Sequence, residues 1–126
     1  MLIDLEPVIL SALRNDTEII ALLGKDSKGT TKVYPLAAPD ISLPRVTFFE
    51  LTNFDNNYAG DKAVSSAIHF HIDVWHNSNP SKVSLAVNRV MESIGFVRSG
   101  TQSLYESDTK IYHRVLRYKK TQLGVD

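Results

Sequence analysis

Alternating apolar and polar side chains mark one long strand in the middle of the chain. Between Ala67 and His76 the large aliphatic and aromatic residues at every second position are Ile68, Phe70, Ile72 and Val74. The positions between them hold His69, His71, Asp73 and Trp75. Because successive strand side chains point to opposite faces, the pattern predicts one core face and one polar face with a large aromatic ring. Such a face is typical of a surface that another subunit covers, or of one that lines the solvated interior of a ring, rather than of one in plain solvent.

Helical spacing recurs in three other stretches. The first is expected to begin near Asp4 and Pro7 and to run to Asn15, and the second to run from Asp16 to Gly24. The third is the clearest, with Asn79 as its cap and Pro80 in its first position. Its apolar stripe consists of Val83, Ala86, Val87, Val90 and Ile94, and Gly95 follows. We expect this stripe to cover the apolar face of the strand.

The remaining strand signals predict two hairpins. A short strand is expected over residues 32–35 and a longer one over residues 45–54, with Phe48 and Phe54 on one face and Phe49 on the other. Residues 55–62 are expected to form a turn-rich link, which makes a long projecting hairpin. Residues 102–107 and 110–122 are expected to form the second hairpin. The sequence predicts one α+β domain over residues 1–126, with a mostly antiparallel sheet of four to five strands, an N-terminal helix and one long helix packed on one face.

Charge and cysteine content exclude several classes of function. Fourteen basic residues balance fourteen acidic ones, which argues against the basic footprint of a protein that binds nucleic acid through phosphates. With no cysteine the chain has no disulfide and no thiolate metal site. The first residues are not those of a signal peptide, and no apolar run approaches the roughly 20 residues of a membrane span. We expect a soluble, cytosolic product that does not enter a membrane.

Metal or ligand binding is the one chemical alternative that the strand pattern offers. His69, His71 and Asp73 share a strand face, and imidazole and carboxylate groups are ligands for divalent metals. Neighbours on one face lie ~7 Å apart, so these side chains share an ion only if they lean together. The other interpretation is an ordinary polar surface. His113 on the last strand is a candidate cross-strand neighbour.

Catalytic motifs are missing from the sequence. It contains no glycine-rich phosphate loop, no nucleophile elbow and no H-E-x-x-H zinc motif. The basic residues of the last strand are Arg114, Arg117, Lys119 and Lys120. They favour a charged edge strand over a nucleic-acid stripe, because the alternation divides them between two faces. Trp75 either closes the rim of the core or lies at an interface. We therefore predict a protein that is not an enzyme and needs no cofactor.

Several short motifs in a particular order give the chain a family resemblance. They are residues 20–24, 32–35, 38–39, 43–46 and 72–76, the helix over residues 83–94, and residues 113–118. In order, spacing and total length they resemble the tail completion proteins of long-tailed bacteriophages, a family similar to tail terminators and head–tail joining proteins. The Ile72-Asp73-Val74-Trp75 strand directly before a helix is the most distinctive element.

The resemblance implies a structural protein of the virion that is made in the host cytoplasm. It implies a ring, expected to be a hexamer, that stops growth of the tail tube at its head-proximal end and joins tail to head. The implied partners are other copies of the chain, the tail tube protein and a head completion or connector protein. DNA would pass through the ring without sequence-specific binding. Our candidate interface residues are Lys25, Lys28, Asn56, Asn57, Tyr58, His69, His71 and Trp75.

Overall fold

A computed structural model describes residues 2–39 and 42–124, which contain three helices packed on a five-stranded sheet. The helices are α1 (Glu6–Asn15), α2 (Thr17–Leu23) and α3 (Ser81–Ser93). The strands are β1 (Val33–Pro35), β2 (Arg45–Ala59), β3 (Lys62–His76), β4 (Val97–Glu106) and β5 (Ile111–Leu123). The strand order is β1-β2-β3-β5-β4, with β1 parallel to β2 and every other pair antiparallel. This confirms the predicted α+β fold.

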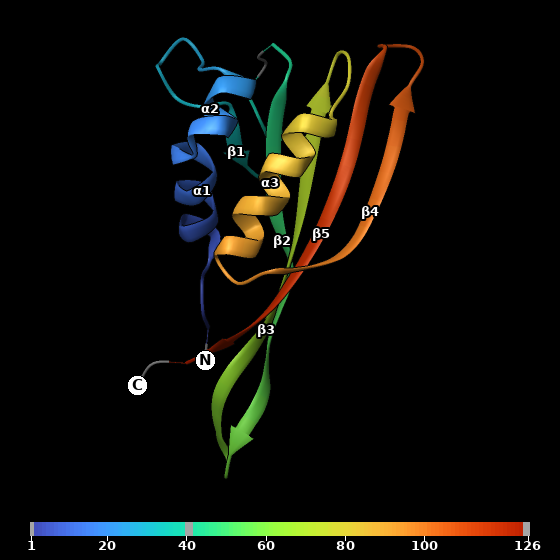
Figure 1. Cartoon of the computed structure of the whole chain (residues 1–126). Helices are drawn as coiled ribbons and strands as arrows, with labels where there is room; N and C mark the ends of the chain where they lie inside the picture. The colour runs from blue at the N-terminus through green and yellow to red at the C-terminus, as the bar shows by residue number, and fades with distance from the viewer. Residues whose placement is uncertain (1, 40–41, 125–126) are drawn as a thin grey trace.

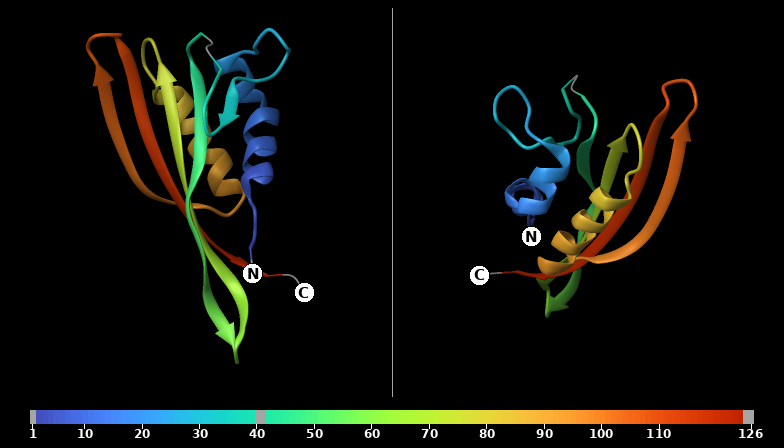
Figure 2. Two further views of the ribbon diagram at one scale, coloured as in Figure 1. Left: turned by 180° about the vertical axis from the view of Figure 1, so that it is seen from behind. Right: turned by 45° about the horizontal axis from the view of Figure 1, so that its top comes forward.

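All the helices in the described residues lie on one side of the sheet (Figure 1). Figure 2 (left) shows the opposite side, on which none of them packs. The predicted apolar positions of β3, from Ile68 to Val74, are fully buried against the helices. Phe70 packs between the rings of Phe48 and Phe96, with ring centroids 6.2 and 5.9 Å away. The core therefore lies between the helices and one face of the sheet.

The helix ends follow local capping chemistry. The Asp16 carboxylate accepts a hydrogen bond from the Ile19 backbone N–H and so caps α2, which ends at Gly24 with φ +73°. The predicted stripe of α3 is buried at Val83, Ala86, Val87 and Val90, and Met91 joins it. Pro80 is the N-cap of α3, one position later than predicted, while the Asn79 side chain accepts from the Ser81 N–H. None of the helices within residues 2–39 and 42–124 is long and apolar enough to span a membrane.

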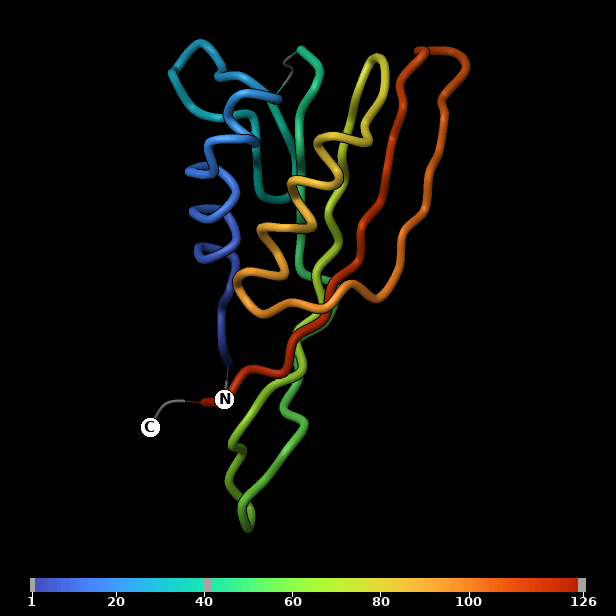
Figure 3. The backbone as a smooth tube through the Cα atoms, viewed as in Figure 1, coloured from blue at the N-terminus to red at the C-terminus, as the bar shows by residue number. Residues whose placement is uncertain are grey.

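The predicted turn-rich link over residues 55–62 is wrong, because β2 continues to Ala59 and only Gly60 and Asp61 form the turn. Polar side chains in this segment bond across the ladder instead of breaking it. Ser66 donates to the Asp55 carboxylate at 3.1 Å, and the Asn57 amide donates to Ser65 Oγ at 2.7 Å. The result is a long two-stranded projection, the β2–β3 arm, at one end of the molecule (Figure 3).

A β-bulge at Leu51 changes which face the end of β2 presents. Pairing passes from Glu50↔Phe70 to Thr52↔His69 and skips Leu51. One extra residue moves every following side chain to the other face. Phe54 therefore stacks beside His69 on the side without helices, and not beside Phe48 as simple alternation predicted.

The charged-edge interpretation of the last strand is also wrong. β5 lies inside the sheet between β3 and β4, so the edges are β1 and β4. The predicted division of charge between the two faces of β5 is confirmed. Lys120 Nζ donates to the Ile94 carbonyl on the helical side, whereas Arg117 and Lys119 are exposed on the other side.

Replacing the central aromatic side chain of the core should be costly. Phe70→Ala removes a fully buried ring and leaves a cavity between Phe48 and Phe96, so we expect the free energy of unfolding to fall by about 3–5 kcal/mol. Urea denaturation followed by circular dichroism measures the change. Leu85→Ala on α3 is the control, because Leu85 is 71% exposed and its loss should change stability by less than about 0.5 kcal/mol. Equal losses in the two variants would contradict the assignment of the core.

Candidate assembly surfaces

The sheet side that faces away from the helices is called here the outer face. Register places on it Arg45, Thr47, Phe49, His69, His71, Asp73, Trp75, Leu104, His113, Val115, Arg117 and Lys119. Strict alternation along β3 and β5 brings these side chains to one surface, because directly opposite residues of antiparallel strands point to the same side. The predicted polar face of β3 is thus confirmed as one strip of a larger surface.

A carboxylate between two imidazole rings lies near the middle of the outer face. Asp73 Oδ1 is 2.8 Å from His71 Nε2 and 2.5 Å from His113 Nε2, and Asp73 is only 7% exposed. A buried carboxylate is tolerated where such partners satisfy it. The suggestion that His113 is a cross-strand neighbour is confirmed, since it lies opposite Trp75. We call these three residues the His–Asp–His cluster.

Aromatic rings cover both imidazoles of the cluster. Phe49 stacks on His71 with centroids 4.6 Å apart, and Trp75 stacks on His113 at 3.8 Å. Trp75 Nε1 also donates a hydrogen bond to Thr47 Oγ1 at 3.1 Å. The indole therefore lies flat on the outer face, on the side of the sheet opposite the core. Its place at an interface stays a prediction.

The geometry does not favour the metal alternative. His69, His71 and Asp73 do not converge: His71 bonds to Asp73, while His69 stacks beside Phe54 at 6.3 Å. Both imidazole Nε2 atoms that approach Asp73 meet the same oxygen, which the hydrogen bonds already occupy. Within the ranges 2–39 and 42–124, no group of three or more His, Cys, Asp and Glu side chains could hold a metal ion.

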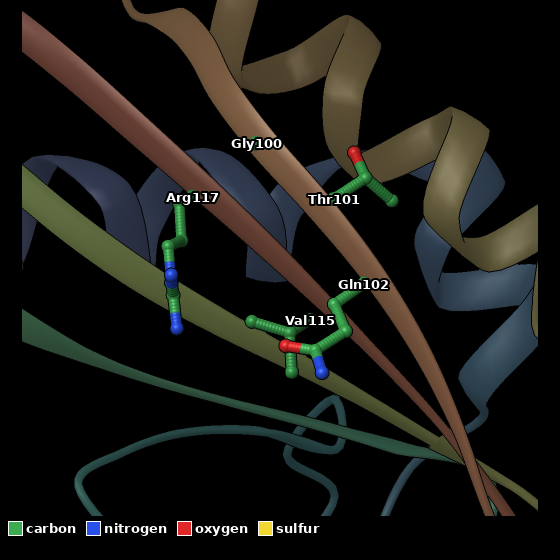
Figure 4. A pocket seen from close by; sticks show the side chains of 5 residues that line it. All are labelled: Gly100, Thr101, Gln102, Val115 and Arg117. Atoms are coloured by element: carbon green, nitrogen blue, oxygen red, sulfur yellow. The ribbon is translucent and has the colours of Figure 1, made fainter.

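A shallow hollow lies beside the edge strand. It has a volume of about 260 Å³ and is lined by Gly100, Thr101, Gln102, Val115 and Arg117. Figure 4 shows the Gln102, Val115 and Arg117 side chains on one side of the two strands and Thr101 on the other. The absence of a side chain at Gly100 leaves open space next to Arg117. The outer face is therefore indented near β4.

The β2–β3 arm carries a second set of candidate residues. Asn56 and Asn57 lie on it and both bond to Ser65: Ser65 Oγ donates to Asn56 Oδ1 at 2.6 Å. Their amides therefore help to hold the two strands of the arm together. Tyr58 is 59% exposed near the tip. Leu51, Phe54 and Val64 are also exposed along the arm. Exposed aromatic and aliphatic groups on a projecting hairpin are suited to a protein contact.

The third set lies in the loop between α2 and β1. Lys25 and Lys28 are exposed, and Asp26 between them organises the loop. Its carboxylate accepts from the Lys28 and Thr30 N–H groups at 2.9 and 3.0 Å and from the Tyr34 hydroxyl at 2.7 Å. Burial, with that hydrogen bond, raises the pKa of Tyr34 to about 12, and the same bond lowers the pKa of Asp26. Tyr34 therefore stays protonated and keeps donating at physiological pH.

The predicted residues fall into three places rather than one. The outer face carries His69, His71 and Trp75, the arm carries Asn56, Asn57 and Tyr58, and the α2–β1 loop carries Lys25 and Lys28. The loop and the arm lie at opposite ends of the molecule (Figure 1). Sequence reasoning missed Phe49, Phe54 and Arg117 as parts of the outer face. Alternation could have indicated Phe49 and Arg117, but the position of Phe54 depends on the bulge.

Comparison with known proteins gives this arrangement a context. No curated protein matches the sequence. A solved structure described as the virion of a native gene transfer agent particle contains a chain with a similar fold, with a TM-score of 0.67 over 92% of each chain at 16% identity. The family model for tail completion protein gp17 matches residues 7–121. Because this match covers nearly the whole chain, the protein belongs to the tail completion protein gp17 family.

Proposed function

We propose that the chain is a structural phage protein that forms a ring, which caps the head-proximal end of the tail tube and joins tail to head. The observation that carries the proposal is the three-way division of exposed surface into a loop end, an arm end and an outer face. A ring subunit needs lateral contacts with its neighbours and axial contacts on both sides. Membership of the tail completion family over residues 7–121 supports the same role.

In this proposal the arm and the α2–β1 loop serve as the axial contacts. The Tyr58 end meets one axial partner and the Lys25 and Lys28 end meets the other, because they lie at opposite ends of the molecule. The partners are the tail tube protein and a head completion or connector protein. Lateral contacts join six copies into a hexamer, and DNA passes through the ring without sequence-specific binding. The protein acts in the virion at the head–tail joint, after synthesis in the host cytoplasm.

The mechanism is geometric rather than catalytic. Each subunit presents different surfaces to its two neighbours, and the rotation between neighbours closes the ring. A closed ring on the end of the tube blocks addition of further tube subunits and leaves its second axial side for the head. This function requires rigid, exposed contact surfaces, which the sheet and the arm supply. It requires no reacting group.

Mass measurement tests ring formation directly. We expect multi-angle light scattering over a range of concentrations, with and without isolated tail tubes, to detect a ring either free or on the tubes. Binding to a tube end raises the local concentration of subunits and so favours closure. Electron microscopy of decorated tubes locates the ring. A protein that stays monomeric and ignores tube ends would contradict the proposed function.

Trp75→Ala should impair assembly more than stability. Loss of a buried indole at an interface typically costs ~2 kcal/mol, so we expect about thirty-fold weaker ring formation from a variant that still folds. Trp75→Phe is the matched control, because it keeps a ring stacked near His113. Light scattering and a tail–head joining assay give the readouts. If Trp75→Ala lowers only the melting temperature and joining is intact, the residue has no interface role.

Substitutions in the arm and in the α2–β1 loop should weaken binding to different axial partners. Tyr58→Ser removes an exposed aromatic ring from the arm and should weaken binding to one axial partner, either tubes or heads, by about ten-fold or more. The double variant Lys25→Ala, Lys28→Ala should weaken binding to the other. Co-sedimentation with isolated tubes and with filled heads measures both. Leu85→Ser is the control, since Leu85 is also exposed but lies on α3, outside both the arm and the loop. Unchanged binding to both partners in all variants would remove the axial assignments.

A further inference from the structure

We propose that the ring closes front to back, with the basic outer face of one subunit against the acidic α1–α2 side of the next. This inference rests on the proposed function and names the lateral partner, a second copy of the chain. The helices lie on one side of the sheet and the outer face on the other (Figure 2), so the two surfaces point in opposite directions. Contacts of this heterologous kind form closed rings when the rotation between subunits allows it.

Exposed positive charge marks the outer face. Arg117 and Lys119 are both exposed on β5, and in the part of the chain that the structure describes no acidic side chain pairs with either. Arg45 lies on the same face, where its guanidinium is 5.8 Å from the Trp75 ring centroid. Asp73 does little to offset them, because it is 7% exposed and enclosed by His71 and His113.

Negative charge marks the α1–α2 side. Residues 4–23 contain four acidic side chains, Asp4, Glu6, Asp16 and Glu18, against one basic side chain, Arg14. Arg14 is turned towards the core edge, where its Nε donates to the Val33 carbonyl and its guanidinium lies over Tyr34. Arg89 from α3 bridges Asp16 and Glu18 at 2.7 and 3.1 Å and offsets part of the charge. The surface stays acidic because no basic side chain within residues 2–39 and 42–124 forms a salt bridge with Asp4 or Glu6.

The two surfaces also share an apolar component, which favours a protein over DNA as the occupant. On the outer side Phe54 is 54% exposed, Val97 59% and Leu104 44%. On the helical side Leu2 is 83% exposed and Val8 47%. Protein–DNA interfaces are more polar and more strongly basic than this mixture of cations and apolar groups. The whole chain is neutral, so a basic face and an acidic face of one molecule balance each other.

Two charge-reversal variants test the pairing. The sheet variant carries Arg117→Glu and Lys119→Glu, and the helix variant carries Glu6→Lys and Glu18→Lys. Each variant alone sets like charges against each other at every lateral contact, and we expect about 100-fold weaker ring formation by light scattering, with or without tubes. In an equimolar mixture the acidic outer face of the sheet variant can meet the basic α1–α2 side of the helix variant, and the two unchanged faces can meet each other. Rings in which the two variants alternate should therefore form, and a ring with an even number of subunits satisfies every contact.

The mixture is also the control for folding, because mixing cannot restore ring formation to a misfolded variant.

The outcomes separate this inference from the ring itself. Rings from the wild type and from the mixture, but from neither variant alone, support the front-to-back contact. Rings from each variant alone overturn it and leave the proposed function standing. Failure of the mixture, with circular dichroism showing both variants folded, also overturns the charge pairing. A sheet variant that forms normal rings but loses non-specific DNA binding would assign Arg117 and Lys119 to the DNA channel instead. A wild type that forms no ring on tubes overturns the proposed function.

Discussion

Burial of the apolar face of β3 is the constraint on which the rest of the structure depends. Ile68, Phe70, Ile72 and Val74 all reach zero exposure under the helices, and β3 is the central strand of the order β1-β2-β3-β5-β4. A strand packed this way is fixed in register, since a slip of one residue would exchange its core side chains for imidazoles and a carboxylate. The same burial commits His69, His71, Asp73 and Trp75 to the outer face. The composition of the outer face is therefore a consequence of the core.

Polar side chains of the outer face are held in fixed positions, although the helices of the described residues all pack on the other side of the sheet. Asp73 is nearly buried among the imidazoles of His71 and His113, and the Phe49 and Trp75 rings stack on those imidazoles. Satisfied in this way, the cluster holds its side chains in fixed positions. A partner that docks there meets a preformed surface and loses little side-chain entropy on binding. Such rigidity suits the proposed ring, in which each subunit sets the angle to its neighbour.

Local patterns were enough to predict which face of β3 and of α3 is buried, but not which strands pair with each other. The period of two in β3 and the stripe of α3 are local properties, and both are confirmed. The position of β5 inside the sheet, and therefore the contact of His113 with Asp73, depends on pairing between residues 40 positions apart. The bulge at Leu51 has no local signature, yet it decides that Phe54 joins the outer face. Asn and Asp in residues 55–57 suggested a turn because their side chains commonly compete with backbone pairing, whereas here Ser65 and Ser66 bond to them across the strands.

The distribution of exposed apolar groups bears on when a ring can form. These groups are spread over the arm, α3 and β4, as Tyr58, Leu85 and Val97 illustrate, so each potential contact buries only part of the apolar surface. A single lateral contact built from a few such groups and screened charges is weak. Weak contacts that close a ring on a template act together, because each bound subunit raises the effective concentration of the next. For the ring proposed above, scattered apolar groups of this kind therefore favour closure on a tube end over closure in free solution.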